Sequence, residues 1–180
     1  NQEGIIKLNQ QGKAVKRFAE KTDITSLFED SEHTLWIGSY QRGLGTLDRK
    51  SGKMHFLNIP SKGYMKAMVE GKDKHLYIST FGYGFMRYAI ETGKWQKFHM
   101  KQEDPVKGRL SNDWVNAMIC DAEGLIWMGH YKGVSCYDPA QERFITGKYN
   151  DQLASQICIS LMEGKEGEIW AGTYNGLFRI

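Results

Sequence analysis

The sequence has few cysteines, few prolines, no long apolar run and no cluster of like charge. Its three cysteines are odd in number and none stands in a CxxC pair, which argues against a disulfide framework and against a cysteine-based metal site. No stretch approaches the roughly 20 apolar residues that span a bilayer, so we expect no membrane contact from this segment. Any export signal of the full protein is expected outside this sequence. The net charge of +3 is dispersed, and nucleic acid is therefore not an expected partner.

What the sequence does contain is one short motif that occurs four times. An aliphatic residue precedes an aromatic residue, and a Gly followed by an apolar residue comes six or seven positions later. The aromatic residues are spaced by 41, 50 and 43 positions, which is typical of the four-stranded blades of a propeller. They are Trp36, Tyr77, Trp127 and Trp170.

Each motif follows a short apolar run whose third residue is Ser or Ala. A small residue at one fixed place suits an inner strand, where blades converge and side chains have least room. Four short runs per period, separated by Gly, Asp and Asn turns, predict an all-β chain of four-stranded antiparallel blades. The small residues are Ser26, Ala67, Ala117 and Ser160.

The blade periods set the expected domain organisation. We expect residues 1–180 to form part of one β-propeller domain, and the periods yield 17 strands, whereas a closed four-bladed ring needs about sixteen. The chain is therefore expected to be a window of four blade periods from a larger propeller of six to eight blades, with seven the favoured number. The periods fall at about 1–18 (partial), 24–56, 65–98, 115–144 and 157–180 (partial).

The repeated aromatic residues are interpreted as packing wedges between blades, not as a surface that stacks sugars or bases, because a large aromatic residue once per unit is typical of a blade core. The Gly before each third strand is likewise interpreted as a backbone requirement. No Gly opens a helix, so a phosphate cradle is not expected.

Residues 110–138 carry the most specific pattern, which reads LSNDWVNAMICDAEGLIWMGHYKGVSCYD. This stretch resembles the two-component-regulator propeller repeat: a Leu-Ser-Asn lead, an apolar strand, Asp-x-x-Gly, an aliphatic-Trp-x-Gly strand, a Gly-apolar pair and Tyr-Asp. The resemblance covers essentially the whole chain in four registers. It is weakest in the second, where Tyr77 replaces Trp and Ser79 replaces Gly.

The resemblance implies a segment of the periplasmic sensor region of a hybrid two-component system of gut Bacteroidetes. Such a sensor has two large propellers and a β-sandwich, joined through one membrane helix to a cytoplasmic histidine kinase. It implies an oligosaccharide as ligand and the neighbouring blades and β-sandwich as partners in the same chain. A second copy, giving a homodimer, is a further candidate partner. The full-length protein would be a histidine kinase, but this segment is expected to have no catalytic activity and no cofactor.

The loop between the second and third strands of each blade contains side chains that suit ligand binding. It holds an aromatic residue followed by residues that differ between blades. The constant aromatic residues are either a sugar-stacking ring or half-buried residues of a repeated turn, and the structural interpretation is favoured. The varied residues are better ligand candidates, and Arg42 and Lys132 suit a sulfate or a uronate. The ligand candidates are Arg42, Tyr83, His130, Lys132, Asn175, Tyr40, Tyr131 and Tyr174, beside Phe81 in the second loop.

Two alternatives to a sensor remain: a scaffold for protein–protein interaction or dimerisation, and a propeller lyase. The five His residues stand mostly in different registers, and only His130 lies in a candidate loop. No nucleophile–base or paired-carboxylate spacing is visible, so no catalytic residue and no metal ligand is assigned. The longest connection, residues 100–115, is either a solvated loop, a contact with a neighbouring domain or part of a binding face.

Overall fold

The strands follow the repeats in a computed structural model that describes residues 4–18, 22–60, 65–100, 108–145, 147 and 152–180. The chain divides into two compact units, residues 1–65 and 66–180. Among the described residues, no helix has the length and apolarity needed to cross a membrane.

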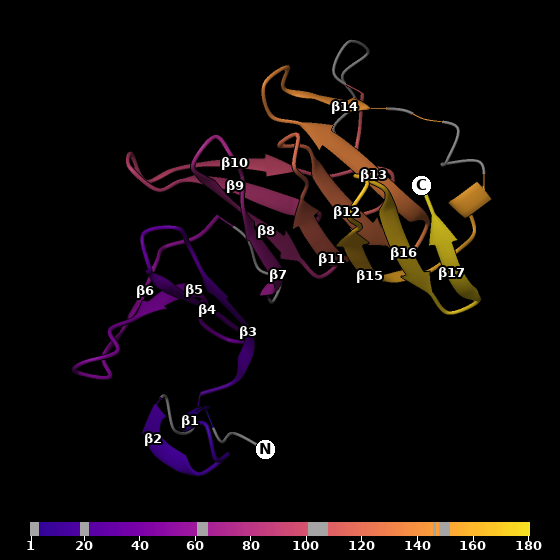
Figure 1. Ribbon diagram of the computed structural model, residues 1–180. Coiled ribbons are helices and arrows are strands. Elements are labelled where there is room, and N and C mark those ends of the chain that lie inside the picture. The colour runs from indigo at the N-terminus through magenta and orange to yellow at the C-terminus, as the bar shows by residue number, and fades with distance from the viewer. Residues whose placement is uncertain (1–3, 19–21, 61–64, 101–107, 146, 148–151) are drawn as a thin grey trace. The chain divides into compact units, whose positions relative to one another are not determined.

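The first unit contains a hairpin and a four-stranded sheet, both antiparallel (Figure 1). The sheet, called the first sheet, has the order β3-β4-β5-β6, and its core includes Phe18, Ile37 and Leu47. The strands are β1 (Ile5–Leu8) and β2 (Ala14–Phe18) in the hairpin, then β3 (Ile24–Glu29), β4 (Leu35–Ser39), β5 (Gly43–Leu47) and β6 (Met54–Phe56).

The second unit contains three antiparallel sheets in the same up-and-down order (Figure 1). The second sheet has β7 (Met65–Glu70, whose first residue closes the first unit), β8 (His75–Thr80), β9 (Phe85–Ala89) and β10 (Lys94–Phe98). The third has β11 (Val115–Cys120), β12 (Ile126–His130), β13 (Gly133–Asp138) and β14 (Arg143–Ile145). The fourth has β15 (Cys158–Glu163), β16 (Ile169–Thr173) and β17 (Gly176–Arg179). The prediction of an all-β chain of four-stranded antiparallel units is confirmed.

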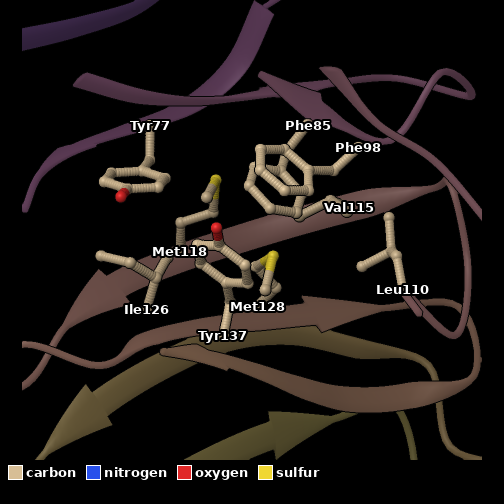
Figure 2. Packing of buried hydrophobic residues seen from close by; sticks show 9 residues of the cluster. All are labelled: Tyr77, Phe85, Phe98, Leu110, Val115, Met118, Ile126, Met128 and Tyr137. Carbon is tan, nitrogen blue, oxygen red and sulfur yellow. The ribbon is translucent and has the colours of Figure 1, made fainter. Parts of the chain in front are cut away.

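A large aromatic core lies between the second and third sheets (Figure 2). Phe85 and Phe98 pair across β9 and β10 and stack with their ring centroids 4.5 Å apart. Tyr137 of the third sheet packs edge-on against Phe98 at 5.0 Å, a favoured aromatic geometry. Tyr77 is fully buried beside them, and Trp127 lies buried in the core that the third and fourth sheets share. The interpretation of the repeated aromatic residues as packing groups is confirmed at these positions.

An acidic residue in the turn before each aromatic residue holds it by a hydrogen bond. Trp36 Nε1 donates to Asp30 Oδ2 at 2.8 Å, and Trp127 Nε1 donates to Asp121 Oδ2 at 2.7 Å. The other oxygen of each carboxylate accepts two backbone N–H groups of its own turn. The Asp therefore closes the turn and satisfies a buried indole N–H at once.

The second and fourth sheets have Gly71 and Gly164 where the others have this Asp, and another acid replaces it. Tyr77 donates its hydroxyl to Asp73 at 2.7 Å, and Trp170 Nε1 donates to Glu168 at 3.1 Å. A Cβ added at Gly71 or Gly164 would collide with the carboxylate that has taken over the role. The hydrogen bond is thus retained although its acceptor comes from a different position.

Candidate functional site

The predicted loop residues of the first unit lie on its surface. Tyr40 is 61% exposed, and its backbone N–H donates to the carbonyl of Asp23 at 3.1 Å. The Arg42 guanidinium lies 4.2 Å from the centroid of the Phe56 ring, a cation–π contact. Arg42 is thus exposed but already packed against an aromatic face of its own sheet.

The corresponding loop of the fourth sheet is the most open of the candidates. Tyr174 is 70% exposed. Asn175 donates its side-chain N–H to Gln156 Oε1 at 2.8 Å, which ties the loop to the segment before β15. An exposed aromatic side chain and an exposed amide therefore stand together here.

His130 differs from Tyr131 and Lys132, the exposed loop residues that follow it, because it is fully buried. The backbone N–H of Lys132 donates to its Nδ1 at 3.2 Å, so Nε2 carries the proton and donates to Ser135 Oγ at 2.9 Å. The Ser135 hydroxyl donates in turn to Ser111 Oγ at 3.2 Å. Burial, with a smaller effect of the Lys132 charge, lowers the pKa of His130 to about 4. His130 is therefore the buried, neutral end of a chain of hydrogen bonds that runs through Ser135 to exposed Ser111.

The loops of the second and third sheets bring three aromatic residues together, which we call the aromatic cluster: Phe81, Trp114 and Tyr131. Trp114 lies edge-on to Phe81 at 4.4 Å between ring centroids and 5.7 Å from Tyr131. Trp114 is 43% exposed and Tyr131 is 40% exposed. Two residues of the predicted loops therefore meet around a tryptophan that lies outside those loops. Exposed Tyr83 and Lys132 continue the same two loops.

Backbone contacts hold the aromatic cluster in place. Phe81 and Trp114 form an isolated antiparallel bridge, and the N–H of Gly84 donates to the carbonyl of Asp113 at 3.0 Å. The N–H of Trp114 donates to the side chain of buried Asn112 at 2.9 Å. Gly82 has a positive φ of 84°, and a Cβ added to it would touch the Trp114 ring at 3.5 Å. The surface is thus preorganised, which reduces the entropy lost when a ligand binds.

A β-bulge recurs at the second residue of three inner strands and redirects its side chain. The register shifts around Thr25 in β3, Asn116 in β11 and Ile159 in β15. Lys66 holds the corresponding sequence position in β7, and its Nζ donates to Asn116 Oδ1 at 2.6 Å. Asn116 donates to the carbonyl of Cys158 at 2.9 Å. The second, third and fourth sheets are linked by these polar contacts between inner strands.

Lys66 also lies beside the aromatic cluster. Its Nζ lies 5.2 Å from the centroid of the Phe81 ring. Burial lowers the pKa of Lys66 below its ordinary value. An amine and three aromatic rings therefore share one region of the second unit.

Sequence reasoning missed Trp114 and Lys66, although both carry a signal. The residue before the inner strand differs between repeats, as Asp23, Trp114 and Ile157 show. The second residue of that strand differs as well. These are the same kind of blade-specific positions that selected Arg42 and Lys132.

Comparison with known proteins identifies the fold. Residues 20–41 match the family model described as two component regulator propeller. The extracellular domain of the putative hybrid two component system BT4673 from B. thetaiotaomicron superimposes with a TM-score of 0.77 at 23% identity over 99% of this chain. The chain is a series of β-propeller blades. The extracellular domain of BT3049 from the same organism gives a TM-score of 0.69 at 21% identity over 98% of the chain.

These propeller blades correspond to a fraction of the proteins they resemble. The chain spans 23% of the BT4673 domain and 22% of the BT3049 domain. Virginiamycin B lyase from Staphylococcus aureus superimposes with a TM-score of 0.68 at 12% identity, over 96% of this chain and 61% of the lyase. No curated protein sequence matches the chain.

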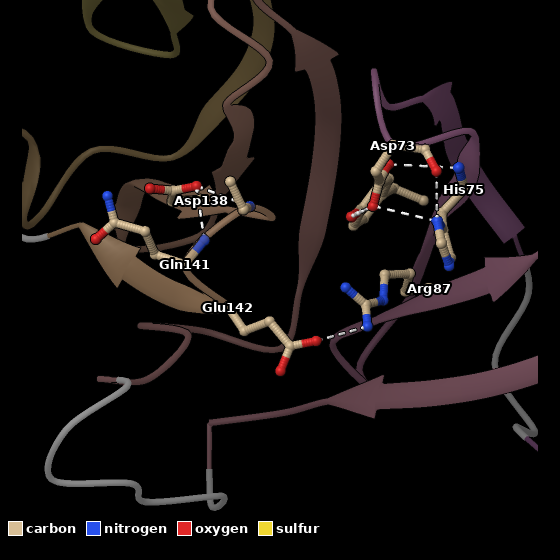
Figure 3. A network of polar contacts seen from close by, with 8 residues as sticks. Asp73, His75, Arg87, Asp138, Gln141 and Glu142 are labelled. Carbon is tan, nitrogen blue, oxygen red and sulfur yellow. Dashed lines mark hydrogen bonds and ion pairs between the residues drawn. The ribbon is translucent and has the colours of Figure 1, made fainter.

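The second blade has a hollow of about 640 Å³ at the end that lies away from the β8–β9 loop. The hollow is lined by residues of β8, β9 and β10 and their turns. Three of its polar residues, Asp73, His75 and Arg87, are engaged in the fold (Figure 3). Arg87 forms an ion pair with Glu142 of the third blade at 2.9 Å, and Asp73 accepts the Tyr77 hydroxyl. These contacts join blades and hold turns, so we assign this edge a structural role.

The cysteines of the blades are packing groups. Burial raises the pKa of Cys136 to about 12 and that of Cys158 to about 11, so neither is a thiolate at neutral pH. Gly129 leaves room for the Cys158 side chain, because an added Cβ would lie 2.5 Å from its Sγ. In the part of the chain that the structure describes, no three His, Cys, Asp or Glu side chains gather as metal ligands.

Proposed function

We propose that this chain is part of the ligand-sensing, periplasmic propeller region of a hybrid two-component sensor histidine kinase, and that its ligand is an oligosaccharide. The observation that carries the proposal is the exposed and preorganised aromatic cluster on a chain of propeller blades. The two-component-regulator repeat at residues 20–41 and the fold shared with extracellular sensor domains support the signalling class.

The chemistry of the cluster suits a sugar. The faces of aromatic rings carry partial negative charge, and the C–H groups of a pyranose ring present partial positive charge and apolar surface to them. Trp114 and Tyr131 offer such surface, and Tyr83, 55% exposed, stands in the same loop as Phe81. In the whole protein, neighbouring blades and a β-sandwich would complete the sensor, and a homodimer would carry the signal.

The test is a glycan array probed with the chain, followed by calorimetry on each glycan that binds. We expect Trp114→Ala to abolish binding to oligosaccharides and Met162→Ala, which removes an exposed apolar side chain of β15 outside the candidate loops, to leave it unchanged. If no glycan binds, the scaffold alternative replaces the sensor. If a glycan is cleaved, the lyase alternative replaces it.

A further inference from the structure

Lys66 is a partly buried ammonium group for which no carboxylate partner stands among the described residues. Its Nζ donates a hydrogen bond to the amide oxygen of Asn116. Desolvating a cation without an opposite charge is unfavourable, and burial accordingly lowers the pKa of this amine. An ammonium group has three N–H donors, so two remain beyond the bond to Asn116 as far as the described residues go.

Asn116 fixes the direction in which this amine points. The Asn116 side chain is buried, accepts from Lys66 with its oxygen and donates to the carbonyl of Cys158 with its nitrogen. Both ends of the amide are therefore engaged, and the amide cannot turn without losing a bond. Asn116 is a positioning residue for Lys66.

The charges around the aromatic cluster favour an anion. Lys66 lies against Phe81, and Lys132 follows Tyr131 on the exposed loop. Asp113, the acid next to Trp114 in sequence, keeps its negative charge and accepts the backbone N–H of Met100 at 2.7 Å, so the two lysines outnumber it beside the cluster. A ligand ring that stacks on Trp114 would thus meet positive charge beside it.

We infer that the aromatic cluster and Lys66 form one binding site for an acidic saccharide, a sugar ring that carries a carboxylate or a sulfate. The ring stacks on Trp114 and Tyr131, and the acidic group accepts hydrogen bonds from Lys66. This inference rests on the proposed function and adds to it the place of the site and the class of the sugar.

The experiment measures binding by calorimetry and by tryptophan fluorescence, with Trp114→Ala giving the signal of the other four tryptophans. The probes are oligosaccharides of matched length that are uronate-containing, sulfated or neutral. We expect an acidic probe to bind and Lys66→Met, which keeps the aliphatic stem, to weaken binding about 10- to 100-fold, as for loss of a charge-assisted hydrogen bond. Lys66→Arg should retain most of the affinity, and Lys165→Met, at an exposed lysine of the β15–β16 turn, should change nothing. Far-UV circular dichroism checks that each variant is folded.

The outcomes separate this inference from the proposed function. If uronates bind and sulfated sugars do not, or the reverse, the acidic group is identified. If a neutral probe binds as tightly and Lys66→Met has no effect, the acidic class is overturned but oligosaccharide sensing stands. If an acidic probe binds with unchanged affinity to Trp114→Ala, the site is overturned while sensing stands. If no probe binds, both are overturned.

Discussion

The turn between the first and second strands of each blade keeps the same hydrogen bond, whereas the loop between the second and third strands differs in every blade. In the turn, Asp73 takes over when Gly71 replaces the usual acid. In the loop, Tyr131 joins Trp114 and Phe81, while Tyr174 stands 70% exposed. In the turn a lost acid is replaced by another, whereas in the loop the residues differ from blade to blade. Folding therefore constrains the turn and leaves the loop free to acquire binding chemistry.

The largest effect on stability is expected for Tyr77, the aromatic residue that the turn of the second blade holds. Tyr77→Ala removes a fully buried ring from the core between the second and third blades, and we expect the free energy of unfolding to fall by about 3–5 kcal/mol. Tyr77→Phe keeps the ring and loses the hydrogen bonds of the hydroxyl with Asp73 and Arg87, so a fall of about 1–2 kcal/mol is expected. Urea unfolding measures both. Equal losses for the two variants would contradict the separation of packing from hydrogen bonding.

His130 is the buried residue among the candidates at the loops between second and third strands. The pH dependence of the free energy of unfolding tests this burial. Its pKa is about 4 when folded and about 6.5 when unfolded, so the unfolded chain binds more protons between these values. The stabilisation is full above pH 6.5 and is lost as the pH falls toward 4, by on the order of 3 kcal/mol.

The matched variant is His130→Thr, because Thr80 and Thr173 hold the same register in other blades. Urea unfolding at a series of pH values should show a shallower decline below pH 6.5 for this variant than for the unchanged chain. Parallel curves would mean that the ring is solvated and free to ionise.

Much of the fold was predictable, because the repeat multiplies each local signal. The small third residue of the inner strand and the Gly before the third strand recur, so they mark the strands without any tertiary information. The β-bulge was not predictable, since register depends on pairing in space. Lys66 therefore looked like an ordinary strand residue, although its bond to Asn116 and its contact with the Phe81 ring place it beside the aromatic cluster.

The candidate site was predictable only in part, for the same reason. The loops pointed to Tyr131, and the structure places it against Trp114. They pointed equally to His130, which replaces the Ser or Thr of other blades, but burial cannot be read from a substitution. Residues that vary between repeats are thus candidates for function or for local repacking, and only the structure separates the two.

The smallest effect on stability is expected at the loop between the second and third strands. It is compared with the effect at the turn between the first and second strands. Trp114→Ala removes a ring that is 43% exposed and packs on Phe81 and Gly82, so the free energy of unfolding should fall by about 1 kcal/mol. The measurement is urea unfolding beside Tyr77→Ala under the same conditions. A loss as large as that of Tyr77→Ala would make Trp114 a core residue. A small loss together with lost glycan binding would mean that the chain keeps this ring on its surface for a ligand, because the fold itself gains little from it.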